Sequence, residues 1–297
     1  MGRPPMSSRW AILVVSLWLS SIASAGPIAS IPGPVDKQGT QAHRQLWRVP
    51  STDPDVLMFT TVFRPSGSGP FPLVVMNHGT TQNPVQREYF PLLEFQAAAL
   101  WFVRQGFVVA APQRPGHGDT GGVFLEDDGD CSRAAFLAAG RAGAANIGKT
   151  IDYMITQSFV RSDHVVVVGQ SAGGWDTLAF VSEHRSNVRA AINFDGGRGG
   201  HFHGRPNNNC RPDQLVDATR VLGRTARTPM LWIYTKNDSY FGPALSKQMF
   251  EAWEAAGGNA EYHLLPAFDD EGHLLVDYPQ AVAVWAPIVK RFLAEHP

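Results

Sequence analysis

The sequence lacks a strong charge of either sign. Its 297 residues include 25 basic and 26 acidic side chains, which gives a formal net charge of -1 at pH 7. No block of like charge appears anywhere along it. Proteins that bind nucleic acid or anionic membranes usually carry a basic patch or stripe. We therefore expect no nucleic-acid partner and no electrostatic binding to a membrane.

Internal repeats and low-complexity tracts are also lacking. Hydrophobic residues make up 44% of the chain and charged residues 17%. That balance excludes a disordered chain, and the length is enough to bury a large core.

The N-terminal apolar run is too short to span a bilayer comfortably. Arg3 and Arg9 precede an apolar run over residues 10–19, and Ala23-Ser24-Ala25 follows. A positive segment, a short apolar segment and an A-x-A site are typical of a signal peptide. The sequence predicts a signal peptide over residues 1–25 and an exported protein, periplasmic or extracellular, with no stable membrane insertion after cleavage. An uncleaved anchor is the alternative.

Cysteine is scarce. Cys131 and Cys210 are the only two, and they lie 79 residues apart. In an oxidising compartment an even number favours a disulfide, to which the chain-entropy model assigns about 4 kcal/mol. Neither cysteine belongs to a C-x-x-C, which argues against a zinc site. Two free thiols are the remaining alternative.

What the sequence does contain is an alternation of apolar strand-like and helix-like segments. Such alternation predicts a parallel sheet covered by helices on both faces. The four valines at residues 165–168 fit a central strand that is buried on both faces. The expected strands cover residues 57–65, 71–79, 107–112, 164–169, 188–197, 229–238 and 260–268. The expected helices cover residues 95–106, 134–157, a segment from about 172, 242–257 and 278–294.

Gly169-Gln170-Ser171-Ala172-Gly173 stands directly between one such strand and a helix. G-x-S-x-G in that setting is typical of a tight turn that exposes a nucleophilic serine at the edge of a sheet. A phosphate-binding turn is the competing interpretation. It would require glycine at position 171 or the lysine of a P-loop, and both are missing.

A nucleophilic serine needs a base and an acid, which in sheets of this kind follow in the order Ser, acid, His. Asp238 and His273 each follow a predicted strand, so they would lie at the same sheet edge as Ser171. Asp195, which ends the preceding strand, is the alternative acid. Three further carboxylates close to the histidine could reach its ring: Asp269, Asp270 and Glu271.

Acyl transfer also needs donors for a developing oxyanion. We expect the backbone amide of Ala172 and a second amide from the loop after an earlier strand, where His78-Gly79 leads to Thr80. Thr80 is the preferred residue and Thr81 the second choice. For His78 we expect a structural role within the loop.

Other residues could line or alter the site. His201 and His203 form an H-x-H that together with Cys210 could suggest a metal, but a third well-spaced ligand is lacking, so a loop at the substrate entrance is favoured. Four aromatic residues are candidates either for the pocket or for the core: Trp101, Trp175, Tyr240 and Phe241.

These motifs, in this order, resemble the α/β-hydrolase superfamily over roughly residues 45–295, and most closely its dienelactone hydrolase-like members. The resemblance implies a single domain over residues 26–297 with an eight-stranded, mostly parallel sheet whose first strands, around 46–65, are antiparallel. Dienelactone hydrolases proper use cysteine where this chain has Ser171, so the resemblance points to a secreted serine esterase.

The implied reaction is two-step hydrolysis of a small-molecule or acyl ester, with no cofactor and no metal. A peptidase related to prolyl oligopeptidases would share the catalytic residues, but those enzymes usually carry a further large domain for which we expect no room. An acyltransferase or a catalytically inactive binding protein could also be built on this scaffold. The sequence does not indicate the oligomeric state.

Overall fold

The computed structural model describes residues 1–2 and 31–297, so the predicted signal peptide falls almost wholly outside the described residues. Residues 31–297 form one compact unit. Within the described part of the chain, no helix has both the length and the apolar composition needed to cross a membrane.

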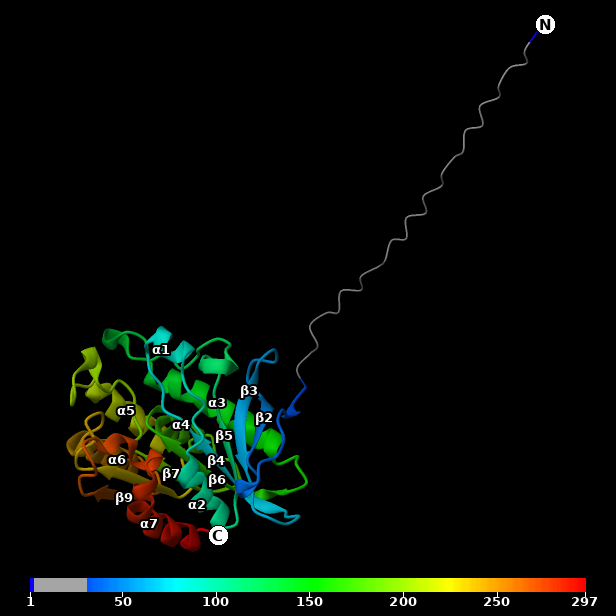
Figure 1. The fold of residues 1–297 in the computed structure, drawn as a ribbon. Helices are drawn as coiled ribbons and strands as arrows, with labels where there is room; N and C mark the ends of the chain where they lie inside the picture. The colour runs from blue at the N-terminus through cyan, green and yellow to red at the C-terminus, as the bar shows by residue number, and fades with distance from the viewer. Residues whose placement is uncertain (3–30) are drawn as a thin grey trace. The chain divides into compact units, whose positions relative to one another are not determined.

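A single nine-stranded sheet organises residues 31–297, with strand order β1-β2-β3-β5-β4-β6-β7-β8-β9 (Figure 1). The strands are β1 Gly33–Pro34, β2 Gln45–Pro50, β3 Leu57–Phe63, β4 Phe71–Asn77, β5 Val108–Pro112, β6 Val160–Gln170, β7 Val188–Phe194, β8 Met230–Thr235 and β9 Ala260–Leu265.

The strand directions confirm the predicted arrangement. The pairs β1–β2, β2–β3 and β3–β5 are antiparallel, and all pairs from β5 through β4 to β9 are parallel. The expected eight strands become nine because the two-residue strand β1 pairs with β2 at the edge of the sheet.

Helices cover both faces of this sheet, as predicted. Apolar residues of α3, α4, α5 and α6 pack in one core, and those of α2 and α7 pack in the other. Alternate valines of β6 enter the two cores: Val165 and Val167 face the first, Val166 and Val168 the second. The helices are α1 Pro84–Glu88, α2 Gln96–Arg104, α3 Phe136–Met154, α4 Ala172–Val181, α5 Pro212–Gly223, α6 Pro243–Ala255 and α7 Val282–Glu295.

Helix α5 is absent from the sequence-based expectation. It lies between β7 and β8, which are parallel neighbours. A parallel pair needs a crossover connection, usually a helix. This requirement, together with Pro212 in its first turn, is the signal by which α5 could have been found.

The predicted disulfide between Cys131 and Cys210 is present, with Cα atoms 5.4 Å apart. It joins the segment before α3 to the segment before α5. The Cys210 amide also donates a hydrogen bond to the Gly199 carbonyl at 2.8 Å, so the bridge is tied to the loop that follows β7.

Candidate active site

Ser171 occupies the sharp turn between β6, which ends at Gln170, and α4, which begins at Ala172. Its backbone has φ 55° and ψ −123°, a conformation that side chains with a β-carbon rarely adopt. The two flanking glycines allow the turn to close. A β-carbon on Gly169 would lie 2.0 Å from the Gly173 carbonyl oxygen, and one on Gly173 would lie 2.2 Å from the Asn77 carbonyl oxygen.

His273 reaches this serine from the segment that follows β9. Its Nε2 lies 2.9 Å from the Ser171 hydroxyl oxygen, and its backbone carbonyl accepts a hydrogen bond from the Gln170 side chain at 2.9 Å. The ring is almost completely buried. Sequence and structure therefore agree in bringing these two residues together.

Asp238 lies on the side of the His273 ring opposite to Ser171. Its Oδ1 lies 3.2 Å from His273 Nδ1 and accepts hydrogen bonds from the Tyr240 and Phe241 amides at 2.7 and 2.9 Å. These amides hold the carboxylate in place. A carboxylate at Nδ1 favours the tautomer that carries its proton there and leaves Nε2 free to accept one.

Asp195, the alternative acid, is fully buried at the end of β7, with φ 49°. Within the described residues, neither of its carboxylate oxygens has a hydrogen-bond partner that meets normal geometry. Burial, and then the neighbouring charge of Asp238, raise the pKa of Asp195 well above its ordinary value. Asp238 is therefore the carboxylate at the imidazole, and the raised pKa of Asp195 favours its protonated form beside Asp238.

Of the three carboxylates close to His273 in sequence, Glu271 contacts its backbone. Glu271 Oε1 accepts hydrogen bonds from the His273 amide at 2.9 Å and the Ser239 amide at 3.2 Å. Asp269 and Asp270 are exposed. Glu271 thus shapes the loop that presents the histidine.

The two expected oxyanion donors, Ala172 and Thr80, line the same pocket as Ser171. The amide of Ala172 is the first of α4 and has no partner within that helix. In the described part of the chain, the Thr80 amide likewise donates no hydrogen bond to another protein group. Both amides are therefore available to a ligand.

The pocket has a volume of about 510 Å³. The Tyr240 ring stacks on the His273 ring at 4.2 Å between centroids, and the His201 ring stacks on Tyr240 at 3.5 Å. His201, Tyr240 and Phe241 line the pocket. The expectation of an entrance loop at His201 matches this placement, and Cys210 is not available as a thiolate ligand because it is bonded to Cys131.

The other two aromatic candidates belong to the core. Trp101 packs edge-on against Trp285 of α7, at 5.2 Å between ring centroids. Trp175 is fully buried, and its indole N–H donates to the Phe136 carbonyl at 2.8 Å. Both large side chains fill space between helices rather than the pocket.

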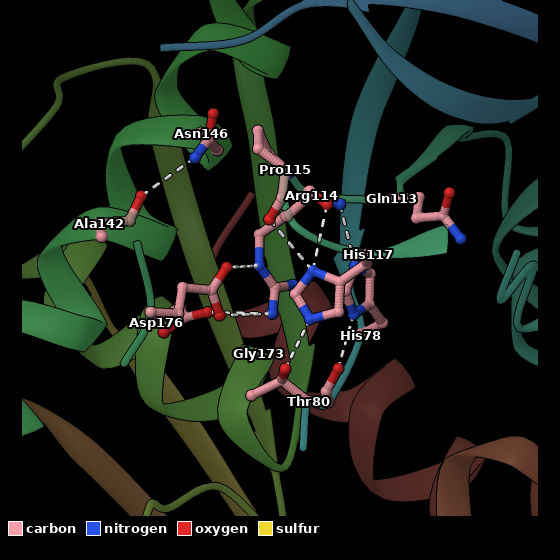
Figure 2. A network of polar contacts seen from close by, with 12 residues as sticks. His78, Thr80, Gln113, Arg114, Pro115, His117, Ala142, Asn146, Gly173 and Asp176 are labelled. Atoms are coloured by element: carbon pink, nitrogen blue, oxygen red, sulfur yellow. Dashed lines mark hydrogen bonds and ion pairs between the residues drawn. The ribbon is translucent and has the colours of Figure 1, made fainter. Parts of the chain in front are cut away.

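A buried cluster of charges beside the pocket was missed from the sequence. Arg198, from the loop after β7, donates to Asp176 Oδ1 at 2.7 Å and to Glu126 Oε2 at 2.9 Å. Arg114 pairs with the same two carboxylates, and Figure 2 shows its pairing with Asp176. Burial raises the pKa of Asp176, although Arg198 opposes that rise. The cluster joins three separate segments around the pocket wall.

Two buried histidines, His78 and His117, lie next to Thr80. The structural role expected for His78 fits its contact with the neighbouring Gly79 carbonyl, at 2.6 Å from Nδ1. His117 was not singled out from the sequence. Its position within the polar segment "QRPGHGDTGG" gave no indication of which atoms it would contact.

Comparison with known proteins agrees with this architecture. The sequence matches the prolyl oligopeptidase family over residues 93–196. No curated protein matches it.

Three solved structures illustrate the similarity of the fold. A protein of Klebsiella pneumoniae, provisionally assigned as a dienelactone hydrolase, has a TM-score of 0.58 and 16% identity, over 84% of this chain and 98% of that one. An esterase of Pyrococcus furiosus has a TM-score of 0.60 and 14% identity, over 85% and 92%. An acylaminoacyl peptidase of Pyrococcus horikoshii has a TM-score of 0.60 and 13% identity, over 84% of this chain but 41% of that one.

Proposed function

We propose that this chain, which has the α/β-hydrolase fold, is a serine hydrolase that cleaves carboxylic esters through a covalent acyl-enzyme. The observation that carries the proposal is the alignment of three side chains. Ser171 Oγ lies 2.9 Å from His273 Nε2, and His273 Nδ1 lies 3.2 Å from Asp238 Oδ1. These two distances suit a nucleophile, a general base and an orienting acid.

The first half of the reaction forms the acyl-enzyme. His273 Nε2 accepts the hydroxyl proton of Ser171 as Oγ bonds to the acyl carbon, and the carbonyl oxygen becomes an oxyanion. The amides of Ala172 and Thr80 donate hydrogen bonds to it. The intermediate then expels the alcohol oxygen, which takes the proton from His273.

The second half repeats these steps with water. His273 accepts a proton from a water molecule as the water oxygen bonds to the acyl carbon. Collapse of the second intermediate releases the carboxylic acid and returns the proton to Ser171. Throughout, Asp238 keeps the imidazole in the tautomer that accepts at Nε2. All groups in this scheme come from the protein, so it requires no cofactor.

Peptide cleavage is the second candidate function. The match to the prolyl oligopeptidase family over residues 93–196 and the similarity in fold to an acylaminoacyl peptidase favour it. The catalytic residues would be the same, since esters and amides pass through the same type of intermediate. Substrate preference, rather than loss of a catalytic residue, separates the two candidates.

The first prediction concerns this preference. We expect the protein to hydrolyse short p-nitrophenyl esters and to be at least 100-fold slower, by kcat/KM, on N-acyl peptide p-nitroanilides. Ser171→Ala should lower kcat on the ester by about 10⁴-fold or more, and Asp238→Asn by about 10³- to 10⁴-fold. A higher kcat/KM on the peptide substrates would instead support the peptidase.

We also propose that the protein is exported. The disulfide between Cys131 and Cys210 supports this, because such bonds persist in oxidising compartments. Mass spectrometry of the protein purified from periplasm and medium tests the proposal. A chain that begins at Gly26 is expected, whereas a full-length chain confined to the cytoplasm would contradict it.

A further inference from the structure

The Thr80 side chain is tied to a buried histidine that has no part in the scheme above. Thr80 Oγ1 lies 2.5 Å from His117 Nε2. The other ring nitrogen, Nδ1, faces the carbonyls of Arg114 and Pro115 at 3.1 and 3.2 Å. A carbonyl can only accept, so Nδ1 carries the proton and Nε2 accepts the hydrogen bond of the Thr80 hydroxyl. Figure 2 shows the His117 ring between these partners.

Burial favours the neutral imidazole that this arrangement needs. His117 is completely excluded from solvent, and its burial is the main reason that its pKa falls to about 4. The ring therefore stays neutral around pH 7. Neutral imidazole has one donor and one acceptor nitrogen, which is what the two sides of His117 require.

A second histidine holds the peptide group that precedes Thr80. His78 Nε2 accepts a hydrogen bond from the Arg114 amide at 3.0 Å, so Nδ1 carries the proton and donates it to the Gly79 carbonyl at 2.6 Å. In a trans peptide the N–H points opposite to the C=O. The Gly79 carbonyl points at His78, so the Thr80 N–H points away from that ring.

The other side of this peptide is the catalytic serine. A β-carbon on Gly79 would lie 3.0 Å from Ser171 Cβ and 3.5 Å from its Oγ. Thr80 and Ser171 also line the same pocket. The Gly79–Thr80 peptide group is thus held next to the nucleophile. His78 binds its carbonyl oxygen, and His117 binds the side chain of the residue that carries its N–H.

We propose that His117 is a positioning residue for the oxyanion hole: by accepting a hydrogen bond from the Thr80 hydroxyl, it keeps the Thr80 amide aimed at the reacting carbonyl oxygen. His78 fixes the carbonyl end of the same peptide. Such preorganised donors stabilise charge that develops in the transition state, so their alignment affects kcat more than substrate binding. This inference rests on the proposed ester hydrolysis.

Thr80→Val gives the most direct test. Valine keeps the size of threonine and leaves the backbone amide in place, but it removes the hydroxyl that binds His117. We expect kcat on a p-nitrophenyl ester to fall about tenfold, less than the 10²- to 10³-fold cost of removing an oxyanion donor outright. KM should stay within about twofold, and Thr80→Ser should recover most of the loss.

A thionoester separates an oxyanion effect from a general loss of structure. Its sulfur accepts hydrogen bonds poorly, so the alignment of the oxyanion donors should matter less. The kcat of Thr80→Val on the thionoester should therefore fall clearly less than tenfold. His117→Phe should reproduce the Thr80→Val pattern. The double variant should be no slower than either single variant, because both remove the same contact. Thr219→Val controls for the loss of a buried threonine hydroxyl elsewhere, since Thr219 Oγ1 binds a carbonyl within α5.

Two results would overturn the inference. In the first, Thr80→Val retains the wild-type kcat. In the second, its kcat falls by the same factor on the ester and the thionoester, and its melting temperature falls as well. Either result would make the contact merely structural. The proposed function fails separately: the wild-type protein would then be inert towards every ester. That outcome would overturn both proposals.

Discussion

At the scale of single residues, the position of Ser171 combines strain with exposure to the pocket. A residue with a β-carbon in such a conformation costs of order 1–3 kcal/mol. The backbone packs tightly around Gly169 and Gly173, where a β-carbon would collide with neighbouring carbonyl oxygens, and this packing holds the turn in place. The strain places Oγ in line with His273 Nε2, 2.9 Å away. This feature could be predicted from the sequence, because the strand, the G-x-S-x-G turn and the helix are contiguous.

The choice of acid could not be made from spacing alone. Asp195 and Asp238 both follow strands at the carboxyl edge of the sheet, on the neighbouring strands β7 and β8. Two carboxylates that face each other in a buried site do not both ionise readily. The backbone amides of Tyr240 and Phe241 stabilise charge on Asp238, whereas Asp195 has no hydrogen-bond donor of normal geometry within the described residues.

Asp195→Asn tests this difference. The asparagine is close in shape to a protonated aspartate, so we expect kcat/KM on an ester to stay within about fivefold of wild type, in contrast to Asp238→Asn. The pKa of Asp195 is raised in the folded state. Above the unfolded pKa of about 4, the unfolded state therefore loses its proton first, and this group destabilises the fold as pH rises.

Consequently, Asp195→Asn should increase the free energy of unfolding relative to wild type more at pH 7 than at pH 4. Between the unfolded pKa and the folded pKa, the gain in free energy of unfolding from Asp195→Asn should grow by up to about 1.4 kcal/mol for each pH unit. Urea denaturation at the two pH values measures it. An equal effect at both pH values, or a loss of activity as large as that of Asp238→Asn, would show that Asp195 is ionised and takes part in the site.

At the scale of elements, the loops after β7 and β8 form one wall of the pocket. A β-carbon on Gly197 would lie 2.6 Å from the Phe241 ring, so the two loops are in close contact. The disulfide reaches this wall through the hydrogen bond from Cys210 to Gly199. We therefore expect the disulfide to stabilise the pocket wall as well as the folded state.

The prediction for Cys131→Ala combined with Cys210→Ala has two parts. The free energy of unfolding should fall by about 2–4 kcal/mol, as for bridges that close loops of this length. KM for an ester should rise several-fold with little change in kcat, because the pocket wall loosens while Ser171 and His273 keep their own supports. Wild type treated with a reducing agent should behave like the double variant. An unchanged KM would show that the wall does not depend on the bond.

Elements with a strong local pattern were predictable, and those defined by distant contacts were less so. The valines of β6 and the helix that became α4 stood out because each carries a continuous apolar signal. Helix α5 did not, since polar residues and Gly223 dilute its apolar side. The positions of His117 and Arg198 depend on which loops meet in space, and a sequence pattern does not contain that information.

At the scale of the whole molecule, the parallel sheet gathers the site from segments that lie far apart in the sequence. Ser171 follows β6, Asp238 follows β8 and His273 follows β9, and parallel strands end at one edge of the sheet. Because each of these residues follows a predicted strand, their positions in the sequence were sufficient to predict that they lie close together. The substrate was not predictable, because the shape of the pocket depends on the loops.

The central claim is that Ser171 is a nucleophile activated by His273. The most direct measurement is labelling of the mature protein with a fluorophosphonate, with the modified peptide located by mass spectrometry. We predict a single adduct on Ser171 in wild type and at least a 100-fold slower rate in the variant His273→Ala, in which the base is lost. An adduct on another residue, or equal labelling rates in the two proteins, would contradict the account.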